Sequence, residues 1–170
     1  MKSLSKSELN SLLEVAGRHS PSDRLWMTIA FNHGLRVSEV LSLSAENIVS
    51  GSLVIQRLKG SRKTVQTLLP SEKAEVEALA AKGGKFFHMH RKTAWLHFKQ
   101  YCAEAGIPSG RDFATPHSLK HTCGRLGFKG GMDVAEIQKY LGHVNGANTM
   151  IYIQSTEEEA CAAFAAAVGQ

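Results

Sequence analysis

Residues 133–153 read DVAEIQKYLGHVNGANTMIYI, and this stretch decides most about the fold. Its first half is predicted to be a helix behind the favourable N-cap Asp133, because apolar residues recur there at helical spacing: Val134, Ile137 and Leu141. A second, short helix is predicted around residues 148–153. It carries Tyr152, which follows His143 by nine residues.

Helical patterns extend outward over most of the chain. Ser5 and Glu8 form a capping-box pair that starts the first helix. The remaining predicted helices lie at about residues 22–32, 37–41, 71–83, 93–105, 116–128 and 156–168. Two runs rich in β-branched and apolar residues, 52–58 and 64–69, predict strands, with residues 86–87 as a candidate third. We therefore expect a mainly α fold with a small antiparallel β-sheet (α+β).

Composition limits the classes of protein that this chain can belong to. Its 170 residues suit one compact domain, and 43% hydrophobic residues suffice for a full core. The net charge of +5 suits a polyanionic partner without proving one. Three cysteines, widely spaced and in no CxxC pair, argue against a disulfide framework. No apolar run is long enough to span a membrane, and the first residues do not resemble a signal peptide.

Several polar residues are candidates for chemistry, although each has an ordinary interpretation. Arg36 could be a surface arginine that pairs with Glu39, and Lys59 could be a solvated turn lysine. His117 could cap a helix, and Tyr152 could belong to the core. Their order along the chain favours a functional interpretation.

Three stretches carry a resemblance to the tyrosine recombinase (phage integrase) family. GLRVSEVLSLSAENI (residues 34–48) resembles the first conserved box of that family, and PHSLKHT (residues 116–122) resembles its His-x-x-Arg box. YLGHVNGANTMIYI (residues 140–153) resembles the Leu-Gly-His box with the nucleophilic tyrosine. The resemblance implies a site-specific DNA recombinase that integrates or excises a mobile element and works without a metal or other cofactor.

The resemblance also implies a role for each residue of the site. Tyr152 would attack a DNA phosphodiester and form a 3′-phosphotyrosyl link. Arg36 would clamp the phosphate, Lys59 would protonate the leaving 5′ oxygen, and His117 would act as general acid/base or phosphate ligand. His143 would donate a hydrogen bond to the phosphate. Lys63 competes with Lys59 for the role of the hairpin lysine.

One position departs from the family pattern. Lys120 stands where the family usually has arginine, so the charge is kept but the two-pronged guanidinium is lost. We still expect Lys120 to belong to the catalytic set. His121, one turn after His117, is interpreted as a packing or supporting residue near DNA. The expected DNA contacts come from Arg57, Arg62, Lys63, Lys120 and His121.

The resemblance runs from the first helix to about residue 156. We expect residues 1–170 to form a single catalytic domain, without the N-terminal domain with which the family clamps the other face of DNA; it is either a part of a larger integrase or a naturally short recombinase. The expected partner is double-stranded DNA, with a monomer in isolation and a homo-oligomer, a tetramer, on DNA. The C-terminal helix could dock on its own domain or on a neighbouring protomer. The expected location is the cytoplasm of a bacterium, near the nucleoid, from a bacterial or phage gene.

Two alternatives remain open at this point. His117, His121 and His143 could be ligands of a zinc-dependent hydrolase, since His-x-x-x-His places two imidazoles on one helix face. No glutamate follows His117 as a base, and Lys120 would repel a dication. Alternatively, the chain could be a non-catalytic DNA-binding or assembly module, which the lysine at position 120 would favour.

Overall fold

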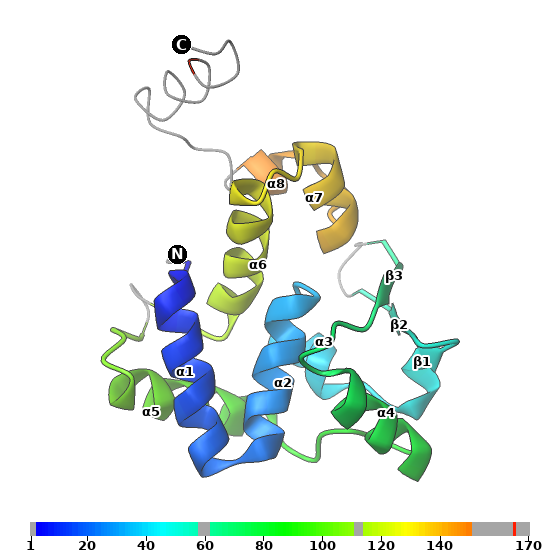
Figure 1. Cartoon of the computed structure of the whole chain (residues 1–170), viewed down its shortest axis with the longest axis vertical. Coiled ribbons are helices and arrows are strands. Elements are labelled where there is room, and N and C mark those ends of the chain that lie inside the picture. Colours follow the sequence, from blue (N-terminus) through cyan, green and yellow to red (C-terminus); the bar gives the residue numbers. More distant parts are fainter. Residues whose placement is uncertain (1–2, 58–61, 111–113, 151–164, 166–170) are drawn as a thin grey trace.

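The computed structural model describes residues 3–57, 62–110, 114–150 and 165. The helices are α1 (Lys6–His19), α2 (Pro21–Asn32), α3 (Val37–Leu41), α4 (Lys73–Lys82), α5 (Arg91–Glu104), α6 (His117–Lys129), α7 (Val134–Leu141) and α8 (Ala147–Met150), with a 3-10 turn η1 (Ala45–Asn47). The strands β1 (Ile48–Val49), β2 (Ser52–Ile55) and β3 (Thr64–Thr67) form a small sheet. The predicted mainly helical α+β class is confirmed (Figure 1).

The first two helices form the centre of the core. Ser5 Oγ accepts from the backbone N–H of Glu8, and the Glu8 carboxylate accepts from the N–H of Ser5, so the predicted capping box starts α1. Pro21 lies in the first turn of α2, where its missing N–H costs no hydrogen bond. The Trp26 side chain of α2 is fully buried, and α2 packs against α1 on one side and α6 on another.

The sheet is antiparallel with the order β1-β2-β3, and Val54 of β2 pairs with Val65 of β3. Both predicted strands are present but shorter than the patterns suggested. The third strand is Ile48–Val49, so the candidate at residues 86–87 is wrong. Phe86 and Phe87 are instead buried in the core, and the segment makes only an isolated bridge between Lys85 and Ser44.

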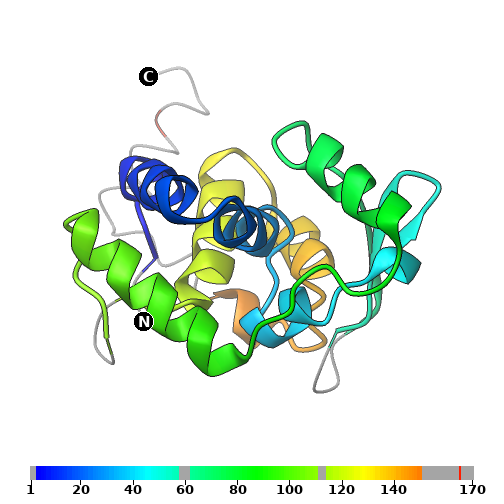
Figure 2. The ribbon, with the colours of Figure 1, turned by 90° about the horizontal axis from the view of Figure 1, so that it is seen from below.

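The C-terminal part of the described chain places the start of the Leu-Gly-His box (residues 140–153) beside the sheet. Asp133 caps α7 through a capping box with Glu136, as predicted for its N-cap, and α7 packs against both α6 and β3. Figure 2 shows the sheet and α4 on one side of the molecule and α1 with α5 on the other. Tyr152 and the predicted C-terminal helix lie outside the described residues, apart from the helical Ala165. No helix in the described part of the chain is long and apolar enough to cross a membrane.

Candidate active site

Arg36 enters the site from the N-terminus of α3. The chain reaches it through Gly34, whose φ of +57° is a left-handed conformation that glycine adopts without strain. A Cβ at Gly34 would also lie 2.2 Å from Leu141 Cδ2, so this turn fits closely against the end of α7. Arg36 Nη1 donates to Glu39 Oε1 at 2.8 Å, and the Arg36 backbone N–H donates to Oε2 at 2.8 Å. The Arg36–Glu39 pair that the ordinary interpretation of Arg36 required therefore exists, but its carboxylate is buried rather than on the surface.

The start of α6 supplies three further residues of the predicted site. His117 is the first residue of the helix, and its ring lies 4.8 Å from that of His121 in an edge-on arrangement. Burial, with the positive charges of His121, Lys120 and Arg36, lowers the pKa of His117 to about 4. Burial also lowers the pKa of His121. The imidazole of His117 is therefore neutral at neutral pH.

Lys120 is almost completely buried, with 2% of its surface exposed. Its Nζ donates to the carbonyl oxygen of Leu141 at 3.1 Å, which ties α6 to the end of α7. Burial, followed by the charges of Arg57 and Arg36, lowers the pKa of Lys120 to about 7, although Glu39 opposes this. Where an arginine would keep a fixed charge, this lysine titrates near neutrality.

His143 follows the αL residue Gly142, which ends α7. Its ring Nδ1 lies 2.9 Å from Thr149 Oγ1, and its backbone N–H donates to the Gln138 carbonyl. Burial, followed by the charges of Lys120, Arg36 and Arg57, lowers the pKa of His143 to about 4. His143 thus belongs to the same electrostatic cluster as the residues of α3 and α6.

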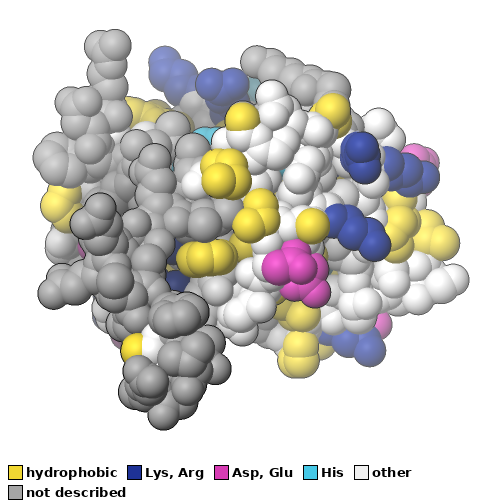
Figure 3. Space-filling model, turned by 90° about the horizontal axis from the view of Figure 1, so that it is seen from above, with side chains coloured by type: hydrophobic (Ala, Val, Ile, Leu, Met, Phe, Trp, Pro, Cys, Tyr) yellow, Lys and Arg dark blue, Asp and Glu magenta, His cyan; other side chains and the backbone are white. Residues whose placement is uncertain are grey.

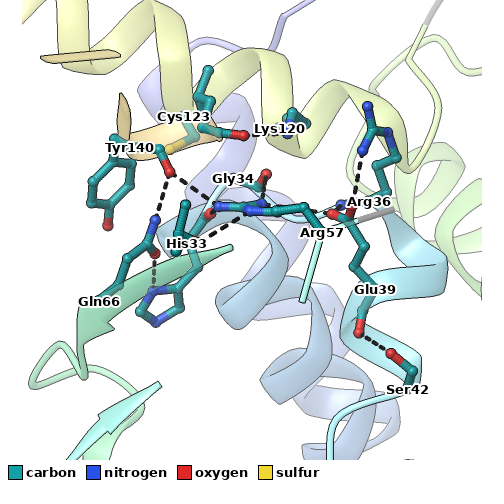
Figure 4. Close-up of polar contacts among 12 residues, drawn as sticks. His33, Gly34, Arg36, Glu39, Ser42, Arg57, Gln66, Lys120, Cys123 and Tyr140 are labelled. Atoms are coloured by element: carbon teal, nitrogen blue, oxygen red, sulfur yellow. Dashed lines mark hydrogen bonds and ion pairs between the residues drawn. The ribbon is translucent and has the colours of Figure 1, made fainter. Parts of the chain in front are cut away.

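Arg57, which we expected to contact DNA, lies inside the molecule (Figure 4). Its guanidinium donates to three carbonyl oxygens, those of Gly34 at 2.8 Å, His33 at 2.9 Å and Tyr140 at 3.0 Å. Nη1 also lies 3.6 Å from Glu39 Oε2. Because its N–H groups donate to carbonyl oxygens within the protein, Arg57 has a structural role here: it joins the segment at residues 33–34 to the end of α7.

The other basic residues of the hairpin have a different setting. Arg62 and Lys63 are exposed beside β3, and they line a groove of about 740 Å³ together with Gln138, Lys139 and His143. The Arg62 backbone N–H donates to the carbonyl of Gly142 at 3.1 Å, so this end of the hairpin is fixed to the turn before His143. Lys59 lies outside the described residues.

The fold therefore brings Arg36, His117, Lys120 and His143 together from three separate segments. Arg36 and His117 also line one pocket of about 370 Å³, with Arg91 and Trp95 of α5. Our sequence reasoning did not foresee the buried polar residues behind this site: His33, Gln66 and Glu72. No sequence signal pointed to Gln66, because the alternation of β3 alone would turn the apolar Val65 inward, whereas Val65 is exposed and Thr64 and Gln66 are the buried residues.

The zinc alternative needs three converging ligands. Over residues 3–57, 62–110 and 114–150 there is no group of three or more His, Cys, Asp or Glu side chains that could hold a metal ion. His117 and His121 face each other beside Lys120 and Arg36, whose charges act on the same cluster. The arrangement suits an anion, such as a phosphate, far better than a dication.

Comparison with known proteins agrees with this geometry. The family model described as the phage integrase family matches residues 2–159. Tyrosine recombinase XerA of Pyrococcus furiosus is 32% identical over 170 residues, covering 91% of this chain and 58% of that protein. The type 1 fimbriae regulatory protein FimE of Escherichia coli K12 is 29% identical over 168 residues, covering 89% of this chain and 85% of FimE.

Solved structures show the same fold. The catalytic domain of bacteriophage HP1 integrase superposes with a TM-score of 0.75 at 20% identity, covering 96% of this chain and 95% of that domain. XerH recombinase bound to its difH substrate in a pre-cleavage complex has a TM-score of 0.77 at 19% identity, over 97% of this chain and 54% of XerH. The chain spans 56% to 59% of the length of its XerA and XerD relatives.

Proposed function

The chain belongs to the phage integrase family, and we propose on this basis that it breaks and rejoins DNA strands at a specific site, with Tyr152 as the nucleophile. One observation carries the proposal: Arg36, His117, Lys120 and His143 form a single electrostatic cluster although they come from distant segments. A cluster of hydrogen-bond donors and cations is suited to stabilise charge on a phosphate.

In the proposed reaction, the Tyr152 oxygen attacks phosphorus and forms the tyrosyl–phosphate bond as the bond to the 5′ oxygen breaks. The phenol loses its proton in this step, and a neutral imidazole such as that of His117 can accept it. Arg36, held by Glu39, offers its guanidinium to the non-bridging oxygens. Lys59 protonates the leaving 5′ oxygen. Attack of a 5′ hydroxyl on the phosphotyrosine reverses these steps and restores the phenol.

In the proposed reaction, Lys120 stands where the family usually has an arginine with a permanent charge, and its own charge depends on pH. A phosphate that approaches the site raises the pKa of Lys120 from about 7, so DNA binding draws a proton onto its amine. His143, whose pKa near 4 leaves its ring neutral, donates a hydrogen bond through an N–H rather than a full charge. Recognition of the scissile phosphate is thus coupled to protonation.

The proposed DNA surface includes Arg62 and Lys63, which are exposed beside His143. His121 supports His117 at the same surface. The positive charge of these exposed side chains suits the phosphate backbone of DNA, because neutralisation of phosphates dominates affinity. The end of the molecule that carries α7 and α8 exposes hydrophobic side chains around an acidic group, with Lys and Arg side chains toward the edges (Figure 3). Val144 and Met150 are 54% and 55% exposed, which suits contact between protomers assembled on DNA in the cytoplasm.

A nicked suicide duplex tests the proposal. It is built from DNA that flanks the gene, so that the short fragment diffuses away after cleavage and traps the covalent complex. Wild type is expected to give a protein–DNA band on a denaturing gel, and Tyr152→Phe is expected to give none. Bands of equal strength from both proteins would rule out Tyr152 as the nucleophile.

A further inference from the structure

A buried chain of polar groups lies behind the cluster, outside the residues assigned to the reaction. It runs from Glu72, just before α4, through His33 at the end of α2, to Gln66 of β3. His33 and Glu72 are at most 1% exposed, and Gln66 is 6% exposed. Polar groups this deep are costly unless each one has its partner, so their partners indicate what the chain does.

The Tyr140 carbonyl, which can only accept, fixes the donor and the acceptor in each of these hydrogen bonds. Gln66 Nε2 donates to the carbonyl oxygen of Tyr140 at 2.7 Å, which turns its amide oxygen toward His33. That oxygen only accepts, and it lies 2.5 Å from His33 Nδ1, so Nδ1 carries a hydrogen. His33 Nε2 contacts a carboxylate oxygen of Glu72.

Glu72 is itself in an environment of donors. Asn32 Nδ2 donates to Oε2 at 2.8 Å, and the backbone N–H of Leu69 donates to Oε1 at 3.2 Å. These bonds favour the ionised carboxylate, which accepts and cannot donate. His33 Nε2 must then carry a hydrogen as well. The ring is therefore an imidazolium held between Glu72 and Gln66.

The row of buried polar groups ends at Tyr140, just before the turn that carries His143. The Tyr140 carbonyl accepts from Gln66 and also from Arg57 Nη2, and the Tyr140 hydroxyl donates to the carbonyl of Asn32 at 2.7 Å. Tyr140 is thus fixed by its backbone to β3 and by its side chain to the end of α2. Three residues further on stands His143, within the same turn (Figure 4 shows His33, Gln66, Arg57 and Tyr140 in contact).

We propose that His33 and Gln66 are positioning residues for strand cleavage: a buried imidazolium, neutralised by Glu72, orients the Gln66 amide so that it holds the Tyr140 carbonyl and with it His143. The inference rests on the proposed function for its catalytic consequence. Its reasoning is that displacement of a catalytic group by about 1 Å lowers rate far more than it lowers affinity. The effect is expected on the cleavage step and not on DNA binding.

Gln66→Met tests the link, because methionine keeps the length and removes both polar ends. Gln100→Met, on the exposed surface of α5, is the matched control. Cleavage of the suicide duplex is followed at saturating DNA, and half-saturation is read from native gels. Gln66→Met is expected to cleave at least about tenfold more slowly than wild type, whereas the DNA concentration that half-saturates it should stay within about twofold of the wild-type value. A rate equal to that of Gln100→Met, or a loss confined to binding, overturns the proposal.

Nitrogen NMR of the histidine rings gives a second measurement that does not depend on cleavage. In wild type, the two ring nitrogens of His33 are expected to resonate close together, as in an imidazolium, and Glu72→Gln is expected to separate them. The His143 ring signals are expected to move in Gln66→Met and not in Gln100→Met. A neutral His33 ring in wild type, or an unmoved His143, overturns the proposal even if Tyr152 forms no covalent complex. Absence of that complex alone would instead refute the proposed function.

Discussion

Arg36 Nη1 donates to Oε1 of Glu39 at 2.8 Å, and the two side chains differ sharply in exposure, 30% for Arg36 and 0% for Glu39. A buried carboxylate thus orients an arginine that reaches the surface. The other carboxylate oxygen lies 3.6 Å from the buried guanidinium of Arg57. Glu39 is therefore the anion that compensates the cations around it, including Lys120.

Replacement of Glu39 by glutamine is expected to remove this compensation. Buried cations left without their anion repel one another, and loss of one partner of a buried pair costs roughly 3 kcal/mol or more. Urea unfolding of Glu39→Gln should show that loss, with cleavage reduced as Arg36 loses its anchor. Glu136→Gln, in the exposed capping box of α7, is the control and should cost under about 1 kcal/mol. Equal effects in the two variants would contradict the role given to Glu39.

Gly142 is expected to tolerate no side chain. Its φ is +68°, and a Cβ there would lie 3.0 Å from Arg62 O and 3.1 Å from Arg57 Cγ. Gly106 has the same φ but no atom within 4 Å of such a Cβ. Gly106→Ala should therefore cost only the backbone strain, about 1 kcal/mol, whereas Gly142→Ala should cost more and also slow cleavage. Thermal unfolding and the suicide duplex measure the two effects, and matching losses would show that the close approach is unimportant.

Lys120 is expected to make DNA binding depend on pH. Its free pKa is about 7, and a bound phosphate raises it, so the protonated amine contributes its full attraction below pH 7. That contribution is lost as the pH rises from about 7 toward the pKa of the bound state. Affinity measured from pH 6 to 9 should therefore fall more steeply for wild type than for Lys120→Arg, whose charge is fixed.

The same variant separates a working enzyme from a non-catalytic module. For an active recombinase, Lys120→Arg should change the cleavage rate little at pH 6.5, where the lysine is mostly charged. A large gain in covalent complex over a silent wild type would instead identify Lys120 as the residue that disables the site. Parallel slopes of affinity against pH in the two proteins would contradict the titration of Lys120.

Acid should destabilise the protein through His117 and His143. Both pKa values are lowered to about 4 by burial, against an unfolded value of 6.5, so the unfolded chain binds more protons between these limits. The stability that they contribute is complete above about pH 6.5 and is lost as the pH falls toward 4. As the pH is lowered from about 6.5 toward 4, the thermal unfolding midpoint should therefore fall less steeply in His117→Gln or His143→Gln than in wild type. The exposed His88→Gln is the control, and a slope unchanged in all three variants would refute this account.

The sequence supported the elements and the site to different degrees. Helix starts were predictable at Ser5 and Asp133, because a capping box depends on residues three apart and needs no tertiary contact. The third strand was misplaced, because two residues at 48–49 carry no periodicity, whereas the apolar pair at 86–87 imitates a strand while filling the core. Arg57 was predicted to contact DNA, because the sequence does not reveal whether the guanidinium of a hairpin arginine points toward solvent or toward carbonyl oxygens inside the protein.

By itself, the sequence determined the helical class and the small sheet, since these depend on local periodicity, and its resemblance to a known family determined the order of the boxes. Only the tertiary structure decided that Arg57 faces three carbonyls, that Lys120 is buried deeply enough to titrate near neutrality, and that His33 bridges Glu72 and Gln66. Burial and hydrogen-bond direction arise from contacts between segments far apart in the chain. Those contacts set the charge state of the site, and a linear pattern does not contain them.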